Sequence, residues 1–243
     1  MSVLVVTGTC TGVGKTVATA AVASLAAARG SAVAVVKPGQ TGARPGEDGD
    51  LAEIGRLAGV TDLHEYARFP DPLSPAAAAR LAGVPPLDLP SAVNRITGLA
   101  ADRELVLVEG AGGLLVRYDD DGNTVADLAR WLGAPVLLVV RPDLGTLNHT
   151  ALTLEAMAHR GLNLAGVVIG SWPDEPDLAM RSNITDLETL AARPLAGALP
   201  AGMGALDPAE FLVAAHRGLS PAFGGSFDAA SFRGAHAPTK ESP

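Results

Sequence analysis

Residues 3–16 read Val-Leu-Val-Val-Thr-Gly-Thr-Cys-Thr-Gly-Val-Gly-Lys-Thr. The apolar first part is typical of a buried strand, and the remainder is a glycine-rich loop that ends in Gly14-Lys15-Thr16. In such loops backbone N–H groups surround an anion, the lysine reaches the β- and γ-phosphates, and the hydroxyl binds Mg²⁺ at a helix N-terminus. The stretch therefore predicts a nucleotide-binding loop. The alternative is a plain glycine turn between a strand and a helix, with Lys15 as a solvated charge.

The spacing within this loop departs from the common pattern, which places a glycine five positions before Gly14. Thr9 occupies that position, and the nearest earlier glycine is Gly8. The loop is therefore one residue longer and reads Gly-x5-Gly-Lys-Thr.

The composition favours one α/β domain. The chain has 243 residues, of which 48% are hydrophobic but only 4% aromatic, and this suits a parallel sheet packed by alanine-rich helices. The net charge of −8 argues against a non-specific partner such as nucleic acid or an anionic membrane. One cysteine, Cys10, allows no intrachain disulfide, and we see no leader or membrane-spanning segment. We therefore expect a cytoplasmic protein without nucleic-acid or membrane partners.

A helix over residues 16–29 and an apolar strand over 32–37 follow the loop, and the strand leads into Lys37-Pro38-Gly39-Gln40-Thr41-Gly42. This order predicts a right-handed crossover and a parallel sheet. Ligands of such sheets bind at the carboxyl ends of strands, so we expect Lys37 and Thr41 to face the phosphate loop. Lys37 is then either a second cation on the phosphates or a side chain that reaches solvent.

Two acidic residues are candidate Mg²⁺ ligands. Asp50 precedes a predicted helix over 51–58, where it is either the N-cap or a metal ligand, and the sequence leaves both open. Residues 104–113 read as a buried strand that ends in Glu109 before a glycine-rich loop. Glu109 is a candidate to hold Mg²⁺ directly or through water, and the glycines permit close backbone approach to a ligand. The alternative is a glycine-rich turn after an acidic strand end.

The rest of the chain continues the alternation. Residues 61–103 are irregular, with a proline-stiffened segment at 69–75 that we expect to cover the site. Further elements are predicted as helices over 76–81, 89–101, 124–132, about 146–160 and 208–217, and as strands over 135–140, 164–169 and 195–199. Residues 220–243 show little apolar periodicity, so we expect a disordered tail that is dispensable for activity and stability.

Four motifs carry a resemblance to a known family. They are Val-Thr-Gly-Thr-x-Thr-Gly-Val-Gly-Lys-Thr at 6–16, Lys-Pro-x-Gln-Thr-Gly at 37–42, Val-Glu-Gly-Ala-Gly-Gly at 108–113 and Asp-Leu-Gly-Thr-Leu-Asn-His-Thr at 143–150. Together, and in this order over residues 1–217, they closely resemble the dethiobiotin synthetase family. The same broad class includes partitioning and septum-site ATPases, nucleotide switches that carry a second lysine where this chain has Cys10. Such a switch is the main alternative function.

The resemblance implies a single-domain P-loop NTPase over residues 1–219 and the activity of an ATP-dependent cyclo-ligase in biotin biosynthesis. The enzyme takes up CO₂ on one amine of 7,8-diaminononanoate as a carbamate, phosphorylates it with ATP, and lets the neighbouring amine close the ureido ring. Carbamate and triphosphate are both anions, so the reaction needs positioning and charge neutralisation rather than a side-chain nucleophile. Mg²⁺, ATP and a homodimer are implied as well.

Site residues carried over from the family are positions of this sequence that match its motifs. Lys15 and Lys37 are implied as catalytic, and Thr16, Asp50 and Glu109 as the Mg²⁺ ligands. The implied nucleotide-binding residues are Gly12, Val13, Gly14, Lys15, Thr16, Val17, Asp50, Glu109, Gly110, Ala111, Gly112, Gly170, Ser171, Pro200, Ala201 and Gly202. The implied substrate-binding residues are Thr11, Lys37, Thr41, Gly112, Gly113, Gly145, Thr146, Leu147 and Asn148. The resemblance also implies that the helix start at Thr146–Thr150 of the partner chain receives the carboxylate of the substrate.

One stretch departs from the family. Members often carry an asparagine-rich loop after the strand at 164–169 to read adenine, whereas this chain has Gly170-Ser171-Trp172-Pro173. Because a pocket lined by backbone discriminates poorly between bases, we expect a weak preference for ATP over other nucleoside triphosphates.

Overall fold

The computed structural model describes residues 3–238, which form one seven-stranded sheet with every pair of neighbours parallel and the order β3-β2-β4-β1-β5-β6-β7. This confirms the predicted fold class. The strands are β1 Val3–Gly8, β2 Val33–Thr41, β3 Leu63–Phe69, β4 Leu105–Gly113, β5 Val136–Val140, β6 Leu164–Trp172 and β7 Gly197–Pro200.

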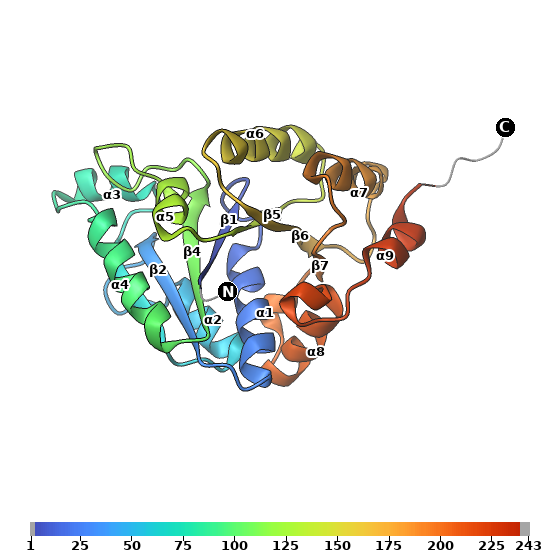
Figure 1. The fold of residues 1–243 in the computed structure, drawn as a ribbon, viewed down its shortest axis with the longest axis horizontal. Coiled ribbons are helices and arrows are strands. Elements are labelled where there is room, and N and C mark those ends of the chain that lie inside the picture. The colour runs from blue at the N-terminus through green and yellow to red at the C-terminus, as the bar shows by residue number, and fades with distance from the viewer. Residues whose placement is uncertain (1–2, 239–243) are drawn as a thin grey trace.

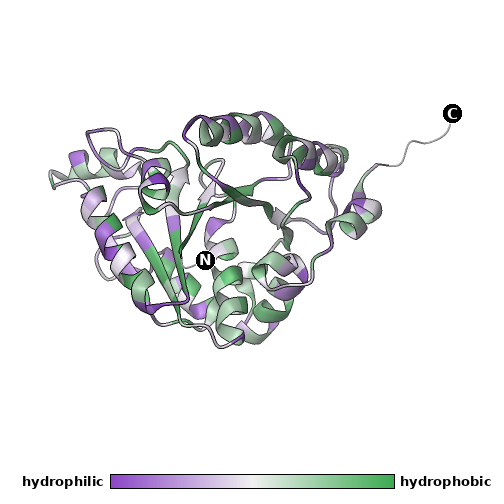
Figure 2. Cartoon of the chain, in the orientation of Figure 1, coloured by the Kyte–Doolittle hydropathy of each residue, from purple (hydrophilic) through white to green (hydrophobic). Residues whose placement is uncertain are grey.

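Helices cover both faces of this sheet (Figure 1). They are α1 Lys15–Ala28, α2 Asp50–Ala58, α3 Pro75–Ala82, α4 Leu89–Asp102, α5 Val125–Leu132, α6 Thr146–His159, α7 Leu178–Ala191, α8 Pro208–Gly218 and α9 Ala229–His236. Helices α1, α2 and α8 pack together on one face, and α4 to α7 lie on the other. The central strands consequently begin with apolar runs, which are green in Figure 2, and all five residues of β5 are buried.

Helix α1 brings the phosphate loop to the sheet. Its residues Ala18, Ala20, Ala21 and Ala23 are fully buried, because the helix lies between the sheet and both α2 and α8. Alanine gives a thin helix with high intrinsic helix propensity, so three helices fit side by side on this face. The first turn of α1 is thereby held at the carboxyl end of β1.

Strand β3 and helix α7 were not predicted. Strand β3 has the sequence Leu-His-Glu-Tyr-Ala-Arg-Phe and pairs with β2 at the sheet edge, where all but the last of its residues are only partly buried. Helix α7 connects β6 to β7 and packs against α6. Within residues 3–238, every helix falls short of the length and apolar character that crossing a membrane requires.

The prediction of a disordered tail is wrong for most of the segment. A 3₁₀ turn covers Pro221–Phe223, and α9 packs against α7. Phe227 is 9% exposed, and the ring centroid of Phe232 lies 5.0 Å from that of Trp172 at the end of β6. The prediction relied on the glycine- and serine-rich composition of the segment and gave too little weight to its three phenylalanines, Phe223, Phe227 and Phe232, which pack on the domain. The last part of the predicted tail, residues 239–243, lies outside the described residues.

Candidate active site

The carboxyl ends of β1, β2 and β4 meet at a cavity of about 620 Å³, as expected for a parallel sheet. Half of the residues expected to bind the nucleotide, Mg²⁺ and the substrate line this cavity. They are Thr11, Gly12, Gly14, Lys15, Thr16, Val17, Lys37, Thr41, Asp50, Glu109, Ala111 and Gly112. Pro72, Leu73, Ser74 and Pro75 line it as well, in agreement with a covering role for the proline-stiffened segment.

The phosphate loop is wound by two glycines in the left-handed region, Gly12 at φ 73° and Gly14 at φ 95°. Lys15 follows as the first residue of α1, and the residue is 7% exposed. Its Nζ donates a hydrogen bond to the carbonyl oxygen of Cys10 at 3.1 Å. Burial, which outweighs the attraction of Glu109, lowers the pKa of Lys15. The ammonium thus lies in the loop without a carboxylate bonded to it, a setting that a polyphosphate would complete.

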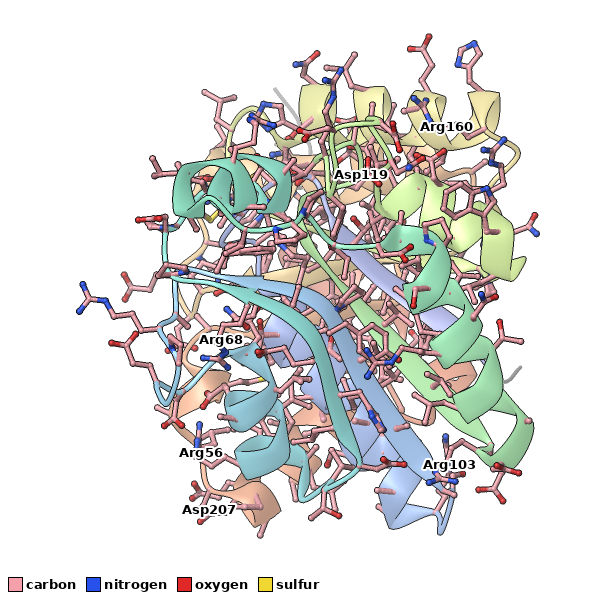
Figure 3. The ribbon with its side chains drawn as sticks, turned by 90° about the vertical axis from the view of Figure 1, so that its left-hand side faces the viewer. Arg56, Arg68, Arg103, Asp119, Arg160 and Asp207 are labelled. Atoms are coloured by element: carbon pink, nitrogen blue, oxygen red, sulfur yellow. The ribbon has the colours of Figure 1, made fainter. Side chains whose placement is uncertain are left out.

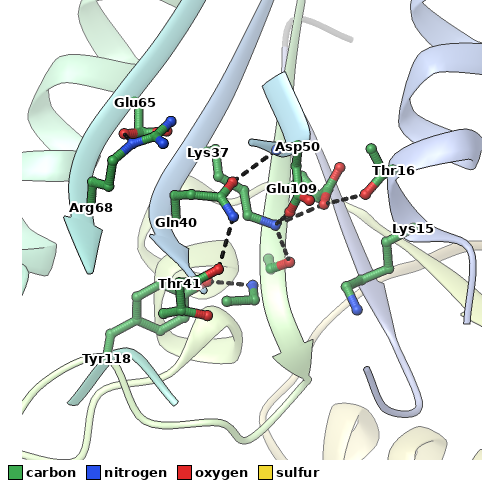
Figure 4. Close-up of polar contacts among 12 residues, drawn as sticks. Lys15, Thr16, Lys37, Gln40, Thr41, Asp50, Glu65, Arg68, Glu109 and Tyr118 are labelled. Atoms are coloured by element: carbon green, nitrogen blue, oxygen red, sulfur yellow. Dashed lines mark hydrogen bonds and ion pairs between the residues drawn. The ribbon is translucent and has the colours of Figure 1, made fainter. Parts of the chain in front are cut away.

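Lys37 lies between two carboxylates (Figure 4). It is 3% exposed, its Nζ donates to Glu109 Oε1 at 2.7 Å and to the Gly110 carbonyl at 3.3 Å, and it forms an ion pair with Asp50. Burial by itself disfavours the charged form, but Glu109 and Asp50 more than offset it and raise the pKa of Lys37 above its usual value. The side chain therefore does not reach solvent, and Lys37 stays cationic in the cavity.

Glu109 is fully buried at the end of the apolar part of β4. Its Oε1 also accepts from Thr16 Oγ1 at 3.1 Å, whereas its Oε2 is buried and finds no hydrogen-bond partner among the described residues. Burial raises the pKa of Glu109 and is the largest effect. Lys37 opposes this rise, the charge of Asp50 adds to it, and the net shift of the pKa is upward. The site thus holds a carboxylate oxygen that lacks a positive partner.

These residues fit a magnesium ion. Mg²⁺ prefers oxygen ligands and is usually held by one or two carboxylates, with phosphate and water completing the shell. Thr16, Asp50 and Glu109 supply such oxygens, and the unpartnered Oε2 of Glu109 is a free acceptor. No group of three or more His, Cys, Asp or Glu that could hold a metal occurs in residues 3–238, so the protein alone does not complete a cage.

Asp50 is not the cap of its helix. Helix α2 begins at Asp50 itself, and its N-cap is Gly49. The carboxylate pairs with Lys37, which outweighs the effect of burial and lowers the pKa of Asp50. The sequence left open whether Asp50 is a helix N-cap or a metal ligand. The geometry excludes the N-cap and leaves the carboxylate of Asp50 in the cavity, where it could bind a metal.

Comparison with known proteins agrees with this geometry. Residues 2–204 match the family described as an AAA domain. The ATP-dependent dethiobiotin synthetase BioD of Parafrankia sp. is 66% identical over 233 residues, which cover 96% of this chain and 98% of that protein. The enzyme of the same name from Streptomyces avermitilis is 55% identical over 98% of this chain and 100% of its own length. The chain belongs to the dethiobiotin synthetase family.

Solved structures share the fold of this dethiobiotin synthetase family member at low identity. The septum site-determining protein MinD from Pyrococcus horikoshii, complexed with Mg-ADP, is 16% identical with a TM-score of 0.55 over 86% of this chain and 88% of that one. A ParA family ATPase from Chlorobium tepidum is 14% identical with a TM-score of 0.53 over 90% of each chain. These likenesses concern the fold alone.

Not all residues expected from the dethiobiotin synthetase motifs line the cavity. Those that lie outside its lining are Val13, Gly110, Gly113, Gly145, Thr146, Leu147, Asn148, Gly170, Ser171, Pro200, Ala201 and Gly202. Val13 is a core residue, 2% exposed. Gly170 is in backbone contact with the phosphate loop, because a Cβ added there would lie 2.0 Å from the Val13 carbonyl oxygen. The structure thus gives Gly170 a packing role that its place in the motif did not reveal.

The start of α6 does not line the cavity of its own chain. Thr146 is 3% exposed, and its Oγ1 donates to the Arg141 carbonyl at 2.7 Å, so its hydroxyl is already engaged. Leu144 is 87% exposed, and Asn148 is exposed too. In a dethiobiotin synthetase chain taken alone, these residues do not meet Lys15 and Lys37 in the cavity.

Sequence reasoning assigned no role to Gln40, Tyr118 and Arg141. Tyr118 is fully buried and its hydroxyl accepts a hydrogen bond from the Ala111 N–H at 2.7 Å, which holds the glycine-rich loop after Glu109. Arg141 Nη2 donates to the Thr11 carbonyl at 3.2 Å and so braces the phosphate loop from the end of β5. The sequence signal that could have identified Gln40 was its place in the Lys-Pro-x-Gln-Thr-Gly motif at 37–42. Tyr118 is an isolated aromatic residue, and the sequence around it gave no sign of its role.

Proposed function

We propose that the protein is an ATP-dependent dethiobiotin synthetase that forms a ureido ring from 7,8-diaminononanoate and CO₂. The observation that carries this proposal is the placement of Lys37. It is a buried, fully charged ammonium in the same cavity as the phosphate-loop Lys15. Two fixed cations around one cavity suit a reaction in which both reacting groups, a carbamate and a triphosphate, are anions.

In the proposed reaction, one amine of the substrate attacks CO₂ and loses a proton, which gives a carbamate. A carbamate oxygen then attacks the γ-phosphorus of ATP, and ADP leaves. The second amine attacks the carbamoyl carbon of the resulting mixed anhydride, the bond to phosphate breaks, and inorganic phosphate departs as the ring closes. Each step needs close positioning of two groups rather than a side-chain nucleophile.

Roles follow from the contacts around the cavity. Lys15 binds the β- and γ-phosphates, and Lys37 neutralises the carbamate and the phosphoryl group in transfer. Thr16, Asp50 and Glu109 hold Mg²⁺, which when bound neutralises phosphate charge. Thr11, Thr41 and Gly112 contact the diamine, and Tyr118 keeps the backbone after Glu109 in place through the Ala111 N–H.

The carboxylate end of the substrate is proposed to bind at the start of α6 of a second subunit. The exposed residues there and their absence from the cavity of their own chain support this arrangement. A helix N-terminus offers free N–H groups to a carboxylate. The active protein is then a homodimer in which each site is completed by the partner.

The test is an assay of ADP and phosphate release with diaminononanoate and bicarbonate, repeated with each of the four common nucleoside triphosphates. Release should require the diamine, and dethiobiotin should form in equal amount. Release without diamine would favour a nucleotide switch and contradict the proposal. A strong preference in kcat/KM for ATP would contradict the backbone-lined base pocket proposed around Gly170, Ser171 and Pro200–Gly202.

A further inference from the structure

Gln40 lies at the centre of the site and joins its two halves. It is 5% exposed, its Oε1 accepts from the Asp50 N–H at 2.9 Å, and its Nε2 donates to the Thr41 carbonyl at 3.0 Å (Figure 4). The backbone partners fix the orientation of the amide, because an N–H needs an acceptor and a carbonyl needs a donor. One buried side chain thus bonds both to a metal-ligand candidate and to a substrate-binding candidate.

The bond to Asp50 replaces a missing helix cap. The first N–H groups of a helix have no partner within the helix and are usually satisfied by the side chain of the N-cap residue. The N-cap of α2 is Gly49, which has no side chain, and Gln40 supplies the acceptor from β2 instead. The position of Asp50 is therefore set by the strand that carries Lys37, not by its own loop.

The turn before α2 is clamped in the same place by a second strand. Arg68, the β3 neighbour of Gln40 in register, donates to the carbonyls of Glu47 at 2.7 Å and Arg44 at 3.1 Å, and it lies over α2 in Figure 3. A Cβ added to Gly49 would lie 2.8 Å from Gln40 Oε1 and 3.1 Å from Arg68 Nη2. The turn thus fits between two fixed side chains with no room for movement toward them.

We propose that Gln40 is a positioning residue that sets the Asp50 carboxylate for Mg²⁺-nucleotide binding and, through Thr41, the substrate side of the cavity. This rests on the proposed function for the identity of the ligands. It adds a cavity-lining residue whose amide bonds to two backbone groups and determines where one metal ligand lies. A residue that only stabilised the fold would affect melting temperature and leave the response to Mg²⁺ unchanged.

The test compares ADP binding with and without Mg²⁺, by calorimetry, in three variants. Gln40→Met keeps the volume but loses both hydrogen bonds, and Gly49→Ala displaces the amide without removing it. Asp88→Ala is the matched control: Asp88 caps α4 by accepting from the Ser91 N–H at 3.0 Å, away from the cavity. Its loss removes a helix cap of similar kind.

We expect Gln40→Met and Gly49→Ala to bind metal-free ADP within about twofold of the parent protein, because the phosphate loop is untouched. In both variants, the factor by which Mg²⁺ increases the affinity for ADP should be about tenfold smaller. A change of this size corresponds to the loss of one to two hydrogen bonds. KM for the diamine should rise in Gln40→Met. Asp88→Ala should lower the melting temperature and keep the full gain.

The positioning role would be overturned if Mg²⁺ increased the ADP affinity of Gln40→Met or Gly49→Ala as much as that of the parent protein. It would also be overturned if Asp88→Ala lost as much of this increase as those two variants. Failure of the parent protein to bind ADP at all would instead contradict the proposed function. The two results are distinguishable because the parent measurement does not depend on Gln40.

Discussion

Lys37 contributes to stability as well as to charge in the cavity. Removing its ammonium leaves Glu109, which is fully buried, and Asp50 without the cation that neutralises them. We expect Lys37→Ala to lower turnover by orders of magnitude and to lower the free energy of unfolding by about 3 kcal/mol in the absence of ligands. Urea unfolding and the coupled ADP-release assay measure the two effects.

Two variants serve as controls for this prediction. Lys15→Ala should lose activity similarly but little stability, because Lys15 Nζ bonds a carbonyl rather than a carboxylate. Adding Glu109→Gln to Lys37→Ala should recover part of the stability, since the uncompensated buried charge is gone. A Lys37→Ala protein as stable as the parent would contradict the ion-pair account.

Asp62 permits a prediction about pH. His64 Nε2 lies 2.7 Å from its Oδ1, and Arg103 Nε donates to its Oδ2 at 2.6 Å. Burial by itself raises the pKa of Asp62, but hydrogen bonds from Arg103 and His64 outweigh it and hold the pKa below its usual 3.8. Because the folded pKa lies below the unfolded one, this contribution to stability is present above pH 3.8 and is lost as pH falls through the folded value.

Asp62→Asn should therefore destabilise the protein at pH 7, by less than about 1 kcal/mol because the pairs are partly exposed. The difference from the parent should shrink as pH falls below 3.8. Thermal unfolding of both proteins over a pH series checks this. A difference that stays constant down to the most acidic point would show that the carboxylate charge is not its cause.

Substitution of Gly170 tests the contact between β6 and the phosphate loop. An added Cβ would lie 2.0 Å from the Val13 carbonyl oxygen in the phosphate loop and 2.6 Å from Val139 Cγ1 in β5. We expect Gly170→Ala to weaken nucleotide binding at least tenfold by moving the loop, about 1.4 kcal/mol or more. Gly98→Ala, inside α4 with no atom within 4 Å, is the control and should be neutral or slightly stabilising.

Among the elements, α9 contradicts the expectation that the tail is dispensable. Its Phe232 and His236 pack on Trp172, with ring centroids 5.0 and 5.4 Å away, and Trp172 accepts the Ala201 N–H on its carbonyl at 2.8 Å. The helix thus supports the two loops at the ends of β6 and β7. Truncation after Ser220 should lower stability by about 2–3 kcal/mol, because the buried side chain of Phe227 is lost and Trp172 becomes exposed.

Tryptophan fluorescence follows this effect directly. Trp131 is 42% exposed and Trp172 is 7% exposed, so a Trp131→Phe background isolates the buried indole. Truncation in that background should shift the emission to longer wavelength and lower the melting temperature. An unchanged spectrum together with an unchanged melting temperature would return the tail to its predicted, dispensable status.

The elements that could be predicted from the sequence are those whose burial leaves a pattern. β1, β2, β4 and β5 each contain a continuous apolar run because both their faces are covered. The carboxyl ends of β1, β2 and β4 pointed to Lys15, Lys37 and Glu109. β3 was not predicted because, as an edge strand, it mixes polar and apolar residues and lacks a continuous apolar run. The roles of Gln40 and Tyr118 could not be predicted because each depends on a backbone N–H group that only folding brings close. Gln40 accepts a hydrogen bond from the Asp50 N–H, and Tyr118 accepts one from the Ala111 N–H.

At the scale of the whole molecule, the cavity and the start of α6 are separate parts of one chain. The cavity holds the cations and the carboxylates, and Gly145–Asn148 do not line it. Apolar side chains at this end, including Leu144 at 87% and Leu152 at 57% exposed, lie uncovered. A closed two-fold dimer brings such a surface of each subunit to its partner and produces two equivalent composite sites.

Mixing two inactive variants tests whether the sites are shared. Lys37→Ala removes the cation from its own cavity, and Asn148→Asp places a negative charge where the substrate carboxylate is proposed to bind. If α6 acts on the partner, a mixed dimer has one site with both defects and one with neither. Equal mixing after unfolding and refolding should then restore activity at about one quarter of the sites, since half of the dimers are mixed. Activity that stays at the level of the separate variants would mean that α6 serves its own cavity or none.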